Sequence, residues 1–417
     1  MEKPLEGVRV LEFTNAVAGP VAGFVLADLG AEVIKVEPTH RGSPAVVGPL
    51  VPGAPDRPYN RVPMFNELNR GKVGLPLDVA RPEGRELFLR LTALCDIVLE
   101  NFSPRALEGL HLEYEDLRQA RPDIIVVSMP AFGRTGAYRD RRSYGPGVDA
   151  MSGLCHLTGY RDAGRPMKPG NFFCDYNAGL LAAFSAMAAL WHRRLTGEGQ
   201  FLECALLDSE LPLVGDALLD AFFNGRPGAP LGNRHPWMAP HGVYPCRGED
   251  AWLAIACPSD AAFQALCQAL GRPELARDPR FRILTERYRH QDELDEEIAA
   301  WTRERDAYEA MRLLQEAGVP AAPVLDAGQL HRDPQYAARG YFVPVHHPEM
   351  GTAPVPGLAF RYQEMAATPA RPAPRFGEHI DYVLGDLLGL AREEIEALES
   401  SGVVARQPRL PGAPSAV

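Results

Sequence analysis

The sequence predicts an α/β protein, with a doubly wound, Rossmann-like large domain and a smaller α/β domain. Three observations predict this fold. β-rich runs alternate with segments of helical periodicity in the first half, which favours parallel strands joined by right-handed crossovers. The run at 123–129 is nearly all apolar, as in a central strand covered on both faces. The Gly- and Pro-rich stretch at 225–230 indicates a linker, and the pattern changes beyond about residue 240.

Local pattern predicts each element in turn. The β-rich run at 8–13 gives the first strand, and helically spaced apolar residues at 18–29, ended by Gly30, give the first helix. The same reasoning predicts strands at 32–37, 96–101, 123–129, 200–205 and 252–257, an extended segment at 319–326, and helices at 82–94, 112–120, 175–194, 206–223, 261–270, 292–303, 306–317 and 392–400.

These elements divide the chain into four parts. We expect a large domain over 1–205 and a helix with a linker over 206–239. A small domain follows over 240–330. Residues 331–417 are Pro-rich and are expected to return to the large domain as an extended segment.

Composition disfavours several classes of protein. The chain has 417 residues and a formal net charge of −11, whereas a general nucleic-acid binder carries a basic surface. The most apolar stretch, 179–191, is too short to span a membrane. Seven scattered cysteines without paired spacing indicate reduced thiols in a cytoplasmic protein. Zinc-ligand spacing is absent from the sequence, so we expect no metal.

Common nucleotide and hydrolase motifs are missing or incomplete. The first strand–helix turn offers only Gly19 and Gly23, and Pro20 removes a backbone donor, which disfavours a dinucleotide site with Glu37 as its acid. The sequence contains neither a P-loop nor a Gly-x-Ser-x-Gly elbow. Cys174 is more simply a buried thiol than a nucleophile. We therefore expect no permanently bound cofactor.

Asp175 opens the helix predicted at 175–194 and has two interpretations. Asp is a favoured N-cap residue, and capping alone is worth about 1 kcal/mol. The same position favours the ionised carboxylate, which is the form that attacks an electrophile. Pattern alone favours the cap and leaves the nucleophile open.

Four motifs, each weak alone, occur together in this chain. They are the opening segments at 5–13, 18–20 and 27–37, then Asn69-Arg70-Gly71-Lys72, then 100–104, and finally 132–153 with Asp175 about twenty residues beyond. The stretch 232–236 adds to them. With these motifs the chain resembles, over residues 1–400, the class III CoA-transferases, the family of the formyl-CoA and carnitine CoA-transferases.

The resemblance implies both a reaction and a site. The family's nucleophilic aspartate falls on Asp175, which would carry CoA as a thioester between an acyl-CoA donor and a free carboxylic acid. We add Arg41 and Arg105 as phosphate ligands, because a guanidinium binds phosphate in a bidentate manner. Tyr144 is expected to assist Asp175. The family's CoA-contacting positions fall on Ala16, Val17, Ala18, Asn69, Arg70, Gly71, Lys72, Asn101, Phe102, Arg142, Ser143 and Tyr144.

Two alternatives accompany this interpretation. The family's racemases of 2-methylacyl-CoA esters use a His-Asp pair that falls here on Tyr144 and Gly145. Tyrosine exchanges an α-proton poorly at neutral pH, which favours transfer. The other alternative is a non-catalytic acyl-CoA-binding protein in which Asp175 only caps its helix. Two departures leave the substrate open: Val17 replaces a Gln that helps to stabilise intermediates, and Cys174 replaces a common Gly.

Substrates and partners follow mainly from the resemblance. Arg234, His235 and His241 are candidates to bind a second carboxylate, which favours a dicarboxylic acid such as succinate. The family forms homodimers of two interlocked rings, and the Pro-rich segment after Arg339 suits the closure of such a ring. A heteromer with a homologous subunit is the alternative. Nucleic acid and membrane are not expected as partners.

Overall fold

A computed structural model gives the structure of residues 3–39, 57–170, 172–365 and 371–408. The chain forms two compact units. The larger unit comprises Met1–Cys155, Lys168–Pro227 and Ala338–Val417, and the smaller comprises His156–Met167 and Gly228–Ala337. The smaller unit therefore begins before the predicted residue 240 and takes in a short segment from the first half of the chain.

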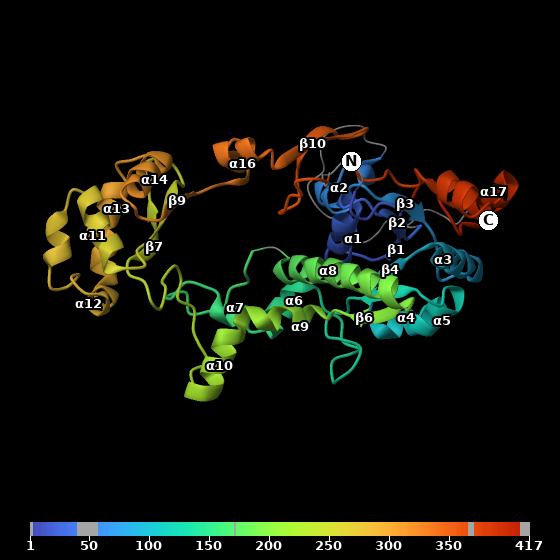
Figure 1. Cartoon of the computed structure of the whole chain (residues 1–417), viewed down its shortest axis with the longest axis horizontal. Helices are drawn as coiled ribbons and strands as arrows, with labels where there is room; N and C mark the ends of the chain where they lie inside the picture. The colour runs from blue at the N-terminus through green and yellow to red at the C-terminus, as the bar shows by residue number, and fades with distance from the viewer. Residues whose placement is uncertain (1–2, 40–56, 171, 366–370, 409–417) are drawn as a thin grey trace. The chain divides into compact units, whose positions relative to one another are not determined.

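A six-stranded parallel sheet organises the larger unit and bears out the predicted doubly wound fold (Figure 1). The strands run in the order β3-β2-β1-β4-β5-β6, which is the Rossmann order. The strand order reverses between β1 and β4, and open α/β sheets bind ligands beyond the carboxyl ends of strands at this point. The strands are β1 (Arg9–Phe13), β2 (Glu32–Glu37), β3 (Val73–Pro76), β4 (Ile97–Glu100), β5 (Ile125–Ser128) and β6 (Gln200–Glu203).

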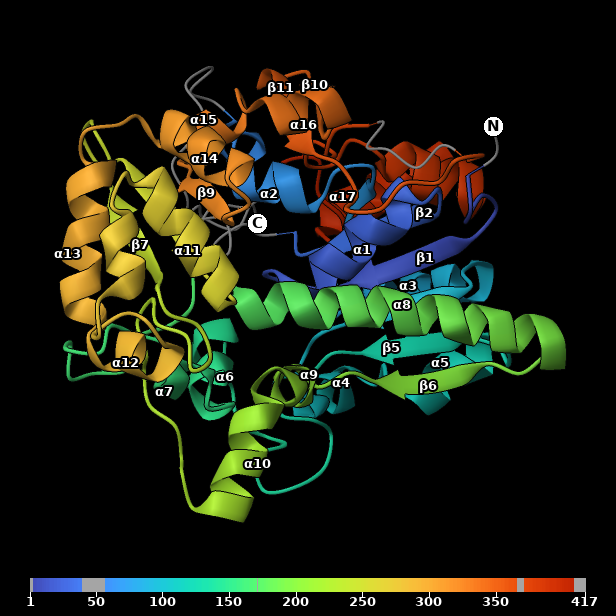
Figure 2. The same cartoon turned by 60° about the vertical axis from the view of Figure 1, so that its left-hand side comes forward.

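Alternating side chains of the strands feed two hydrophobic cores, one on each face of the sheet. Val10 and Ile97 join the core under α1 (Ala18–Asp28) and α8 (Phe173–Thr196), which lie side by side (Figure 2). Leu11 joins the opposite core, which also receives side chains from α3 (Pro82–Leu94), α5 (Tyr114–Ala120) and α17 (Arg392–Ser401). The predicted helix at 82–94 and the strand at 32–37 are confirmed at both ends.

Shorter elements complete the larger unit. The helix predicted over 206–223 is interrupted, because Pro212 has no N–H to continue it, and a 3-10 turn separates two helices. The shorter elements are η2 (Pro58–Asn60), α2 (Pro63–Leu68), α4 (Pro104–Leu110), α6 (Gly145–Met151), α9 (Leu206–Glu210), η3 (Leu211–Val214) and α10 (Gly215–Asn224), together with α7 (Leu154–Leu157), which begins in the larger unit and ends in the smaller one.

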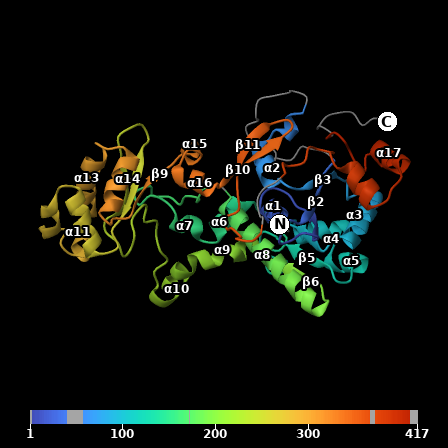
Figure 3. The ribbon, with the colours of Figure 1, turned by 45° about the horizontal axis from the view of Figure 1, so that its top comes forward.

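The C-terminal part of the chain returns to the larger unit. β10 (Phe342–His347) and β11 (Gly351–Pro356) form a hairpin near α2 (Figure 3), where Asn60 Nδ2 donates to the Glu349 carboxylate at 3.0 Å. The π-helix η5 (Asp381–Leu387) adds Val383 to the second core. This segment was predicted to be extended up to a helix at 392–400; α17 confirms that helix, and the hairpin and the π-helix were not predicted.

The smaller unit packs helices against a three-stranded antiparallel sheet. Asp306 caps α14 by accepting the N–H groups of Tyr308 and Glu309. The elements are β7 (His241–Pro245), β8 (Trp252–Ala256), α11 (Asp260–Ala269), η4 (Pro273–Arg277), α12 (Leu284–Arg289), α13 (Gln291–Thr302), α14 (Ala307–Glu316), β9 (Ala321–Val324), α15 (Ala327–Leu330) and α16 (Pro334–Arg339), the last of which ends in the larger unit.

In the described part of the chain, one helix, α8, is long and apolar enough to cross a membrane by length and composition. It extends beyond the apolar stretch at 179–191 on which the sequence prediction rested. Ala182 and Ala186 of this helix are fully buried in the first core, as expected of a core helix.

Candidate active site

A cavity of about 420 Å³ opens at the carboxyl ends of β1, β4 and β5 in the larger unit. This is the edge of the sheet at which its strand order reverses. The walls of the cavity come from the loops after these strands, from the segment that enters α6, and from the first turns of α8 and α9. The lining residues are Asn15, Ala16, Asn101, Phe102, Ser103, Ala106, Met129, Pro130, Ala131, Phe132, Arg139, Arg141, Arg142, Ser143, Tyr144, Gly145, Asp175 and Leu206.

Asp175 lies in this cavity, in the first turn of α8. The helix begins at Phe173, so Asp175 is its third residue and the prediction that Asp175 caps the helix is wrong. The capping position belongs to Phe172, which is left-handed (φ 53°) and makes no side-chain cap. The Asp175 carboxylate accepts its own N–H and that of Ala18, the first residue of α1. It therefore lies between the positive N-terminal ends of two helices.

Two glycines allow this placement. A Cβ atom at Gly179 would lie 2.6 Å from the Ala18 carbonyl oxygen, so glycine lets α8 approach α1 closely. A Cβ atom at Gly145 would lie 1.9 Å from Asp175 Oδ2. The backbone at the start of α6 therefore packs directly against the carboxylate, and the site has no room for a side chain at position 145.

Burial controls the titration of Asp175. The residue is only 6% exposed, and burial raises its pKa from 3.8 to about 6. The nearby Asp149 acts in the same direction, whereas the Cys174 thiol and the backbone of Ala18 lower the pKa. At neutral pH the group is therefore mainly a carboxylate, and it is more basic than an exposed aspartate.

The loop between β1 and α1 is held by a pair of asparagines. Asn15 N–H donates to Asn101 Oδ1, and Asn101 Nδ2 donates to the Asn15 carbonyl, both at 2.8 Å. This clamp helps to hold Ala16 in the left-handed region, at φ 59°, which an alanine rarely adopts. Ala16, Asn101 and Phe102 line the cavity where the sequence predicted a CoA site. Val17 is buried, so its side chain is not available to a ligand.

The segment that enters α6 brings positive charge to the cavity. Arg142, Ser143 and Tyr144 line it at the predicted positions. Arg141 and Arg139 also line it and were not predicted. Arg139 pairs with Glu108, whereas Arg141 and Arg142 have no ion-pair partner among the residues that the structure describes. Of the two arginines that we added, Arg105 is exposed on α4 outside the lining, and Arg41 lies outside the described residues.

The predicted CoA ligands at 69–72 lie inside the larger unit instead. Arg70 and Asp28 are each 2% exposed and form an ion pair at 2.9 Å. Lys72 Nζ lies 2.6 Å from Glu12 Oε2 and 3.1 Å from Asn69 Oδ1. Burial lowers the pKa of Lys72 to about 7. These side chains make their contacts within the fold, so the arrangement gives no support to the expectation that they face a ligand.

The predicted carboxylate-binding residues belong to the smaller unit. Arg234 pairs with Asp292 at 2.7 Å and with Asp295 at 2.6 Å, so two carboxylates already neutralise its charge. The His235 and His241 rings lie 5.2 Å apart, and His241 Nδ1 bonds to the Asn233 carbonyl. The structure therefore gives no support to Arg234 as the receptor of a substrate carboxylate.

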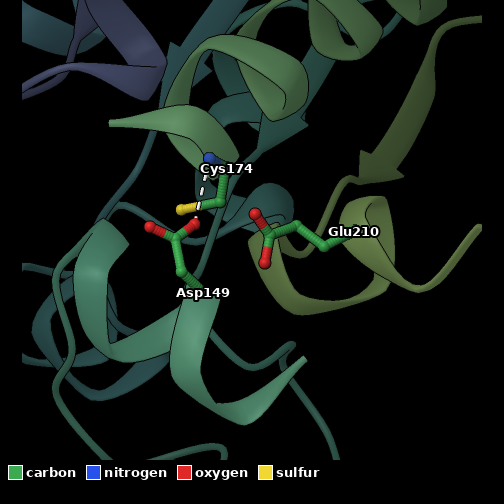
Figure 4. Close-up of side chains that lie close together, drawn as sticks. All are labelled: Asp149, Cys174 and Glu210. Atoms are coloured by element: carbon green, nitrogen blue, oxygen red, sulfur yellow. Dashed lines mark hydrogen bonds between the residues drawn. The ribbon is translucent and has the colours of Figure 1, made fainter. Parts of the chain in front are cut away.

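A cluster of three buried side chains behind Asp175 was not predicted from the sequence. Ligand atoms of Asp149, Cys174 and Glu210 lie within 4.8 Å of one another (Figure 4). Such a set could in principle hold a metal ion, but the thiol donates to the Gly145 carbonyl at 3.3 Å. Burial, with the nearby Asp175 and Asp149, raises the pKa of this thiol well above its ordinary value. The cluster therefore suits a proton better than a metal. Cys174 is buried, as predicted.

Comparisons with known proteins agree on one family. The model of CoA-transferase family III matches residues 5–380. The chain is 36% identical over 405 residues to the succinyl-CoA–D-citramalate CoA-transferase of Chloroflexus aurantiacus, covering 96% of this chain and 98% of that protein. It is 36% identical over 393 residues to the succinate–glutarate CoA-transferase of Agrobacterium fabrum, covering 93% and 97%. A CaiB/BaiF family protein from Brucella suis has a similar structure, with a TM-score of 0.83, 31% identity, and coverage of 93% and 100%.

Proposed function

The chain belongs to CoA-transferase family III and is an acyl-CoA:carboxylate CoA-transferase, and we propose that it works through a CoA thioester on Asp175. One observation carries this proposal. The Asp175 carboxylate lines the cavity, is nearly buried, and has a pKa of about 6, raised chiefly by burial. A basic, desolvated carboxylate that is still ionised at neutral pH suits nucleophilic attack.

The proposed reaction has four balanced steps. The Asp175 carboxylate attacks the carbonyl carbon of the donor thioester, and the C–S bond breaks to give an acyl-aspartyl anhydride and CoA thiolate. The thiolate then attacks Asp175 Cγ and expels the donor acid, which leaves CoA as a thioester on Asp175. The acceptor carboxylate attacks Cγ and releases the thiolate, which finally attacks the acceptor carbonyl. Asp175 is regenerated without net uptake of protons and without ATP.

Two of these steps place a negative charge on the carbonyl oxygen of Asp175 itself. The N–H of Ala18 already donates to this carboxylate, so the donor is in place before the charge develops. A single donor of this kind is worth about 3 kcal/mol of transition-state stabilisation. We assign this role to Ala18 because Val17, which replaces the family Gln, is buried and has no hydrogen-bonding side chain.

The close contact at Gly145 favours transfer over racemisation. The racemase acid falls on position 145, where a Cβ atom would lie 1.9 Å from Asp175 Oδ2. We expect Gly145→Ala to lower turnover at least about a hundredfold, because it displaces the nucleophile from its attack position. Gly109→Ala is the matched control, since its Cβ would meet nothing within 4 Å, and its turnover should be unchanged. Normal turnover of Gly145→Ala would contradict the proposed geometry.

The CoA moiety is proposed to lie along the wall formed by Ala16, Asn101 and Phe102, with its phosphates near Arg141 and Arg142. Both guanidinium groups are exposed and are among the lining residues. Arg41 stays a proposed phosphate ligand on chemical grounds alone. Tyr144 lines the same cavity and is proposed to contact the acyl group.

The acids are proposed from the relatives. The names of the two relatives above pair succinyl-CoA or succinate with citramalate or glutarate. We therefore propose succinyl-CoA as the donor and a short dicarboxylic acid as the acceptor.

We also propose a cytoplasmic homodimer, with a heteromer of homologous subunits as the alternative. Exposed aromatic side chains on α8 and α10 support self-association, since Trp191 is 61% and Phe222 80% exposed.

A trapping experiment tests the proposed intermediate. The protein is mixed with succinyl-CoA, treated with hydroxylamine and digested, and mass spectrometry should find the hydroxamate on the peptide that carries Asp175. Asp175→Ala should give neither the adduct nor transfer to glutarate. Absence of the adduct in an active wild-type protein would contradict the aspartyl route, and activity in Asp175→Ala would do the same. Racemase activity would instead exchange deuterium at C2 of a methylacyl-CoA, and a non-catalytic binder would do neither.

A further inference from the structure

Two carboxyl groups lie buried together behind the nucleophile. Asp149 on α6 and Glu210 at the end of α9 are both 0% exposed, and their carboxyl groups point toward each other (Figure 4). Among the described residues, Asp149 Oδ2 and both carboxyl oxygens of Glu210 accept no hydrogen bond when the two groups are ionised. Within the described residues, neither carboxyl has an ion-pair partner. Two ionised carboxylates would therefore face each other without compensation.

Such a pair retains one proton. Burying two unpaired negative charges is far costlier than burying one charge and one carboxylic acid that donates to it. Burial, together with the adjacent Asp149 carboxyl group, raises the pKa of Glu210 to about 7. The geometry places this proton between the two carboxyl groups, which point toward each other.

The pair is connected directly to the first turn of α8. Asp149 Oδ1 accepts the N–H of Cys174 at 3.3 Å. The Cys174 thiol lies 3.3 Å from the Gly145 carbonyl and 3.7 Å from Asp175 Oδ2. Helix α6 thus holds the nucleophile's turn at two points, through Asp149 near its end and through the backbone of Gly145 at its start. A change in the charge of Asp149 acts on the position and the basicity of Asp175.

We propose that Asp149 and Glu210 are positioning residues that share one proton, and that this proton keeps the first turn of α8 in place and limits the negative charge beside Asp175. The inference rests on the proposed function of Asp175. Neither residue lines the cavity, so both act through the nucleophile rather than on the substrate.

A pH dependence follows from the surroundings of the pair. The groups that face it are the thiols of Cys155 on α7 and Cys174 on α8, the Asp175 carboxylate, and the Ser152 hydroxyl at the end of α6, and the Lys168 ammonium group acts on Cys155. Burial raises the pKa of both thiols, and Asp149 and Glu210 contribute to the shift at Cys155. Loss of the shared proton therefore adds a negative charge that these neighbours do not neutralise. Each oxyanion in the reaction then becomes costlier, and turnover falls on the alkaline side.

Isosteric amide substitutions test whether the shared proton, rather than the shape of the two side chains, causes the pH dependence. Glu210→Gln and Asp149→Asn each keep a donor and an acceptor in the pair but remove the titrating proton. We expect wild-type kcat to fall about tenfold or more between pH 6 and pH 8.5. Each amide variant should instead keep kcat within about threefold over this range. Asp208→Asn, an exposed change on α9, is the matched control and should keep the wild-type profile.

Three results bear on the inference. A wild-type kcat that is constant from pH 6 to pH 8.5, or an alkaline fall that persists in Glu210→Gln, would overturn it.

Infrared spectroscopy of the free protein supplies a readout that does not depend on transfer. In the difference spectrum between wild type and Glu210→Gln, which removes the bands of other protonated carboxyl groups such as Asp175 and Glu100, a protonated-carboxyl band should be present at pH 6 and weaken by pH 8.5. If the band behaves in this way but no transfer occurs, the proposed function fails while the proton-sharing pair stands, and if the band is missing the pair itself is refuted.

Discussion

Replacing the nucleophile by its isosteric amide should stabilise the protein while abolishing transfer. Asp175→Asn keeps an oxygen that accepts the N–H of Ala18, so the hydrogen bond at the start of α1 is preserved. What the substitution removes is a buried charge that the folded protein holds at a cost. If the Asp175 charge is unfavourable for folding, neutralising it should raise the free energy of unfolding.

The magnitude follows from the pKa of Asp175 in the two states. The pKa is 3.8 for the unperturbed group and about 6 in the folded protein. Because the folded pKa is the higher one, the folded state binds the proton more tightly. The resulting stability is fully present below pH 3.8 and is lost as the pH rises through 6. The amide does not lose it, so its advantage over wild type should be about 1.5 kcal/mol at pH 5 and about 3 kcal/mol at pH 8.

Urea unfolding of both proteins at pH 5, 6, 7 and 8 measures this difference. Asp216→Asn is the matched control, because Asp216 also lies in the first turn of a helix but is exposed, and its unfolding free energy should change little at any of these pH values. Mass spectrometry verifies that the amide at position 175 persists. A variant that is no more stable than wild type at pH 8, or whose advantage does not grow from pH 5 to pH 8, would refute this account of the Asp175 environment.

Three further predictions concern the same unit. The kcat/KM for acyl-CoA should rise as the pH increases through about 6, because protonated Asp175 cannot attack, and a profile without this acid limb would exclude Asp175 as the titrating group. Arg142→Ala should raise the KM for acyl-CoA about tenfold, an effect that weakens at high salt, whereas Arg105→Ala on the exposed side of α4 should not change it. Arg70→Met should lower the free energy of unfolding by about 3–5 kcal/mol by leaving Asp28 buried without its partner, and a changed KM with normal stability would restore Arg70 as a CoA ligand.

Much of the fold could be predicted because its signals are local. Apolar periodicity located the helix at 82–94 and the strand at 32–37 at both ends, and alternation of strands and helices gave the parallel sheet. Features that depend on tertiary contacts were missed. The short strand β3 (Val73–Pro76) has little pattern of its own and is defined by pairing with β2. The interruption at Pro212 was visible in the sequence but was outweighed by the apolar periodicity around it.

The site could be predicted only in part. Motif positions located Asp175, Asn101 and Arg142 in one cavity, because a motif identifies which loop reaches the edge of the sheet. The same kind of motif could not show that Arg70 turns inward to Asp28, since a basic residue in a loop carries no sign of its direction. The Asp149–Glu210 pair gave no signal at all. The two residues lie far apart in the sequence and meet only because α6 and α9 both pack at the start of α8.

The second core of the larger unit is completed by the last part of the chain. Val383, Ile395 and Val404 pack there with Leu11 and Ile34 from the first two strands. A ribosome must therefore deliver nearly the whole polypeptide before this face of the sheet, which α3 and α5 cover only in part, is completely covered. Until then part of an apolar surface stays open on the nascent chain, and exposed apolar surface of this kind promotes aggregation.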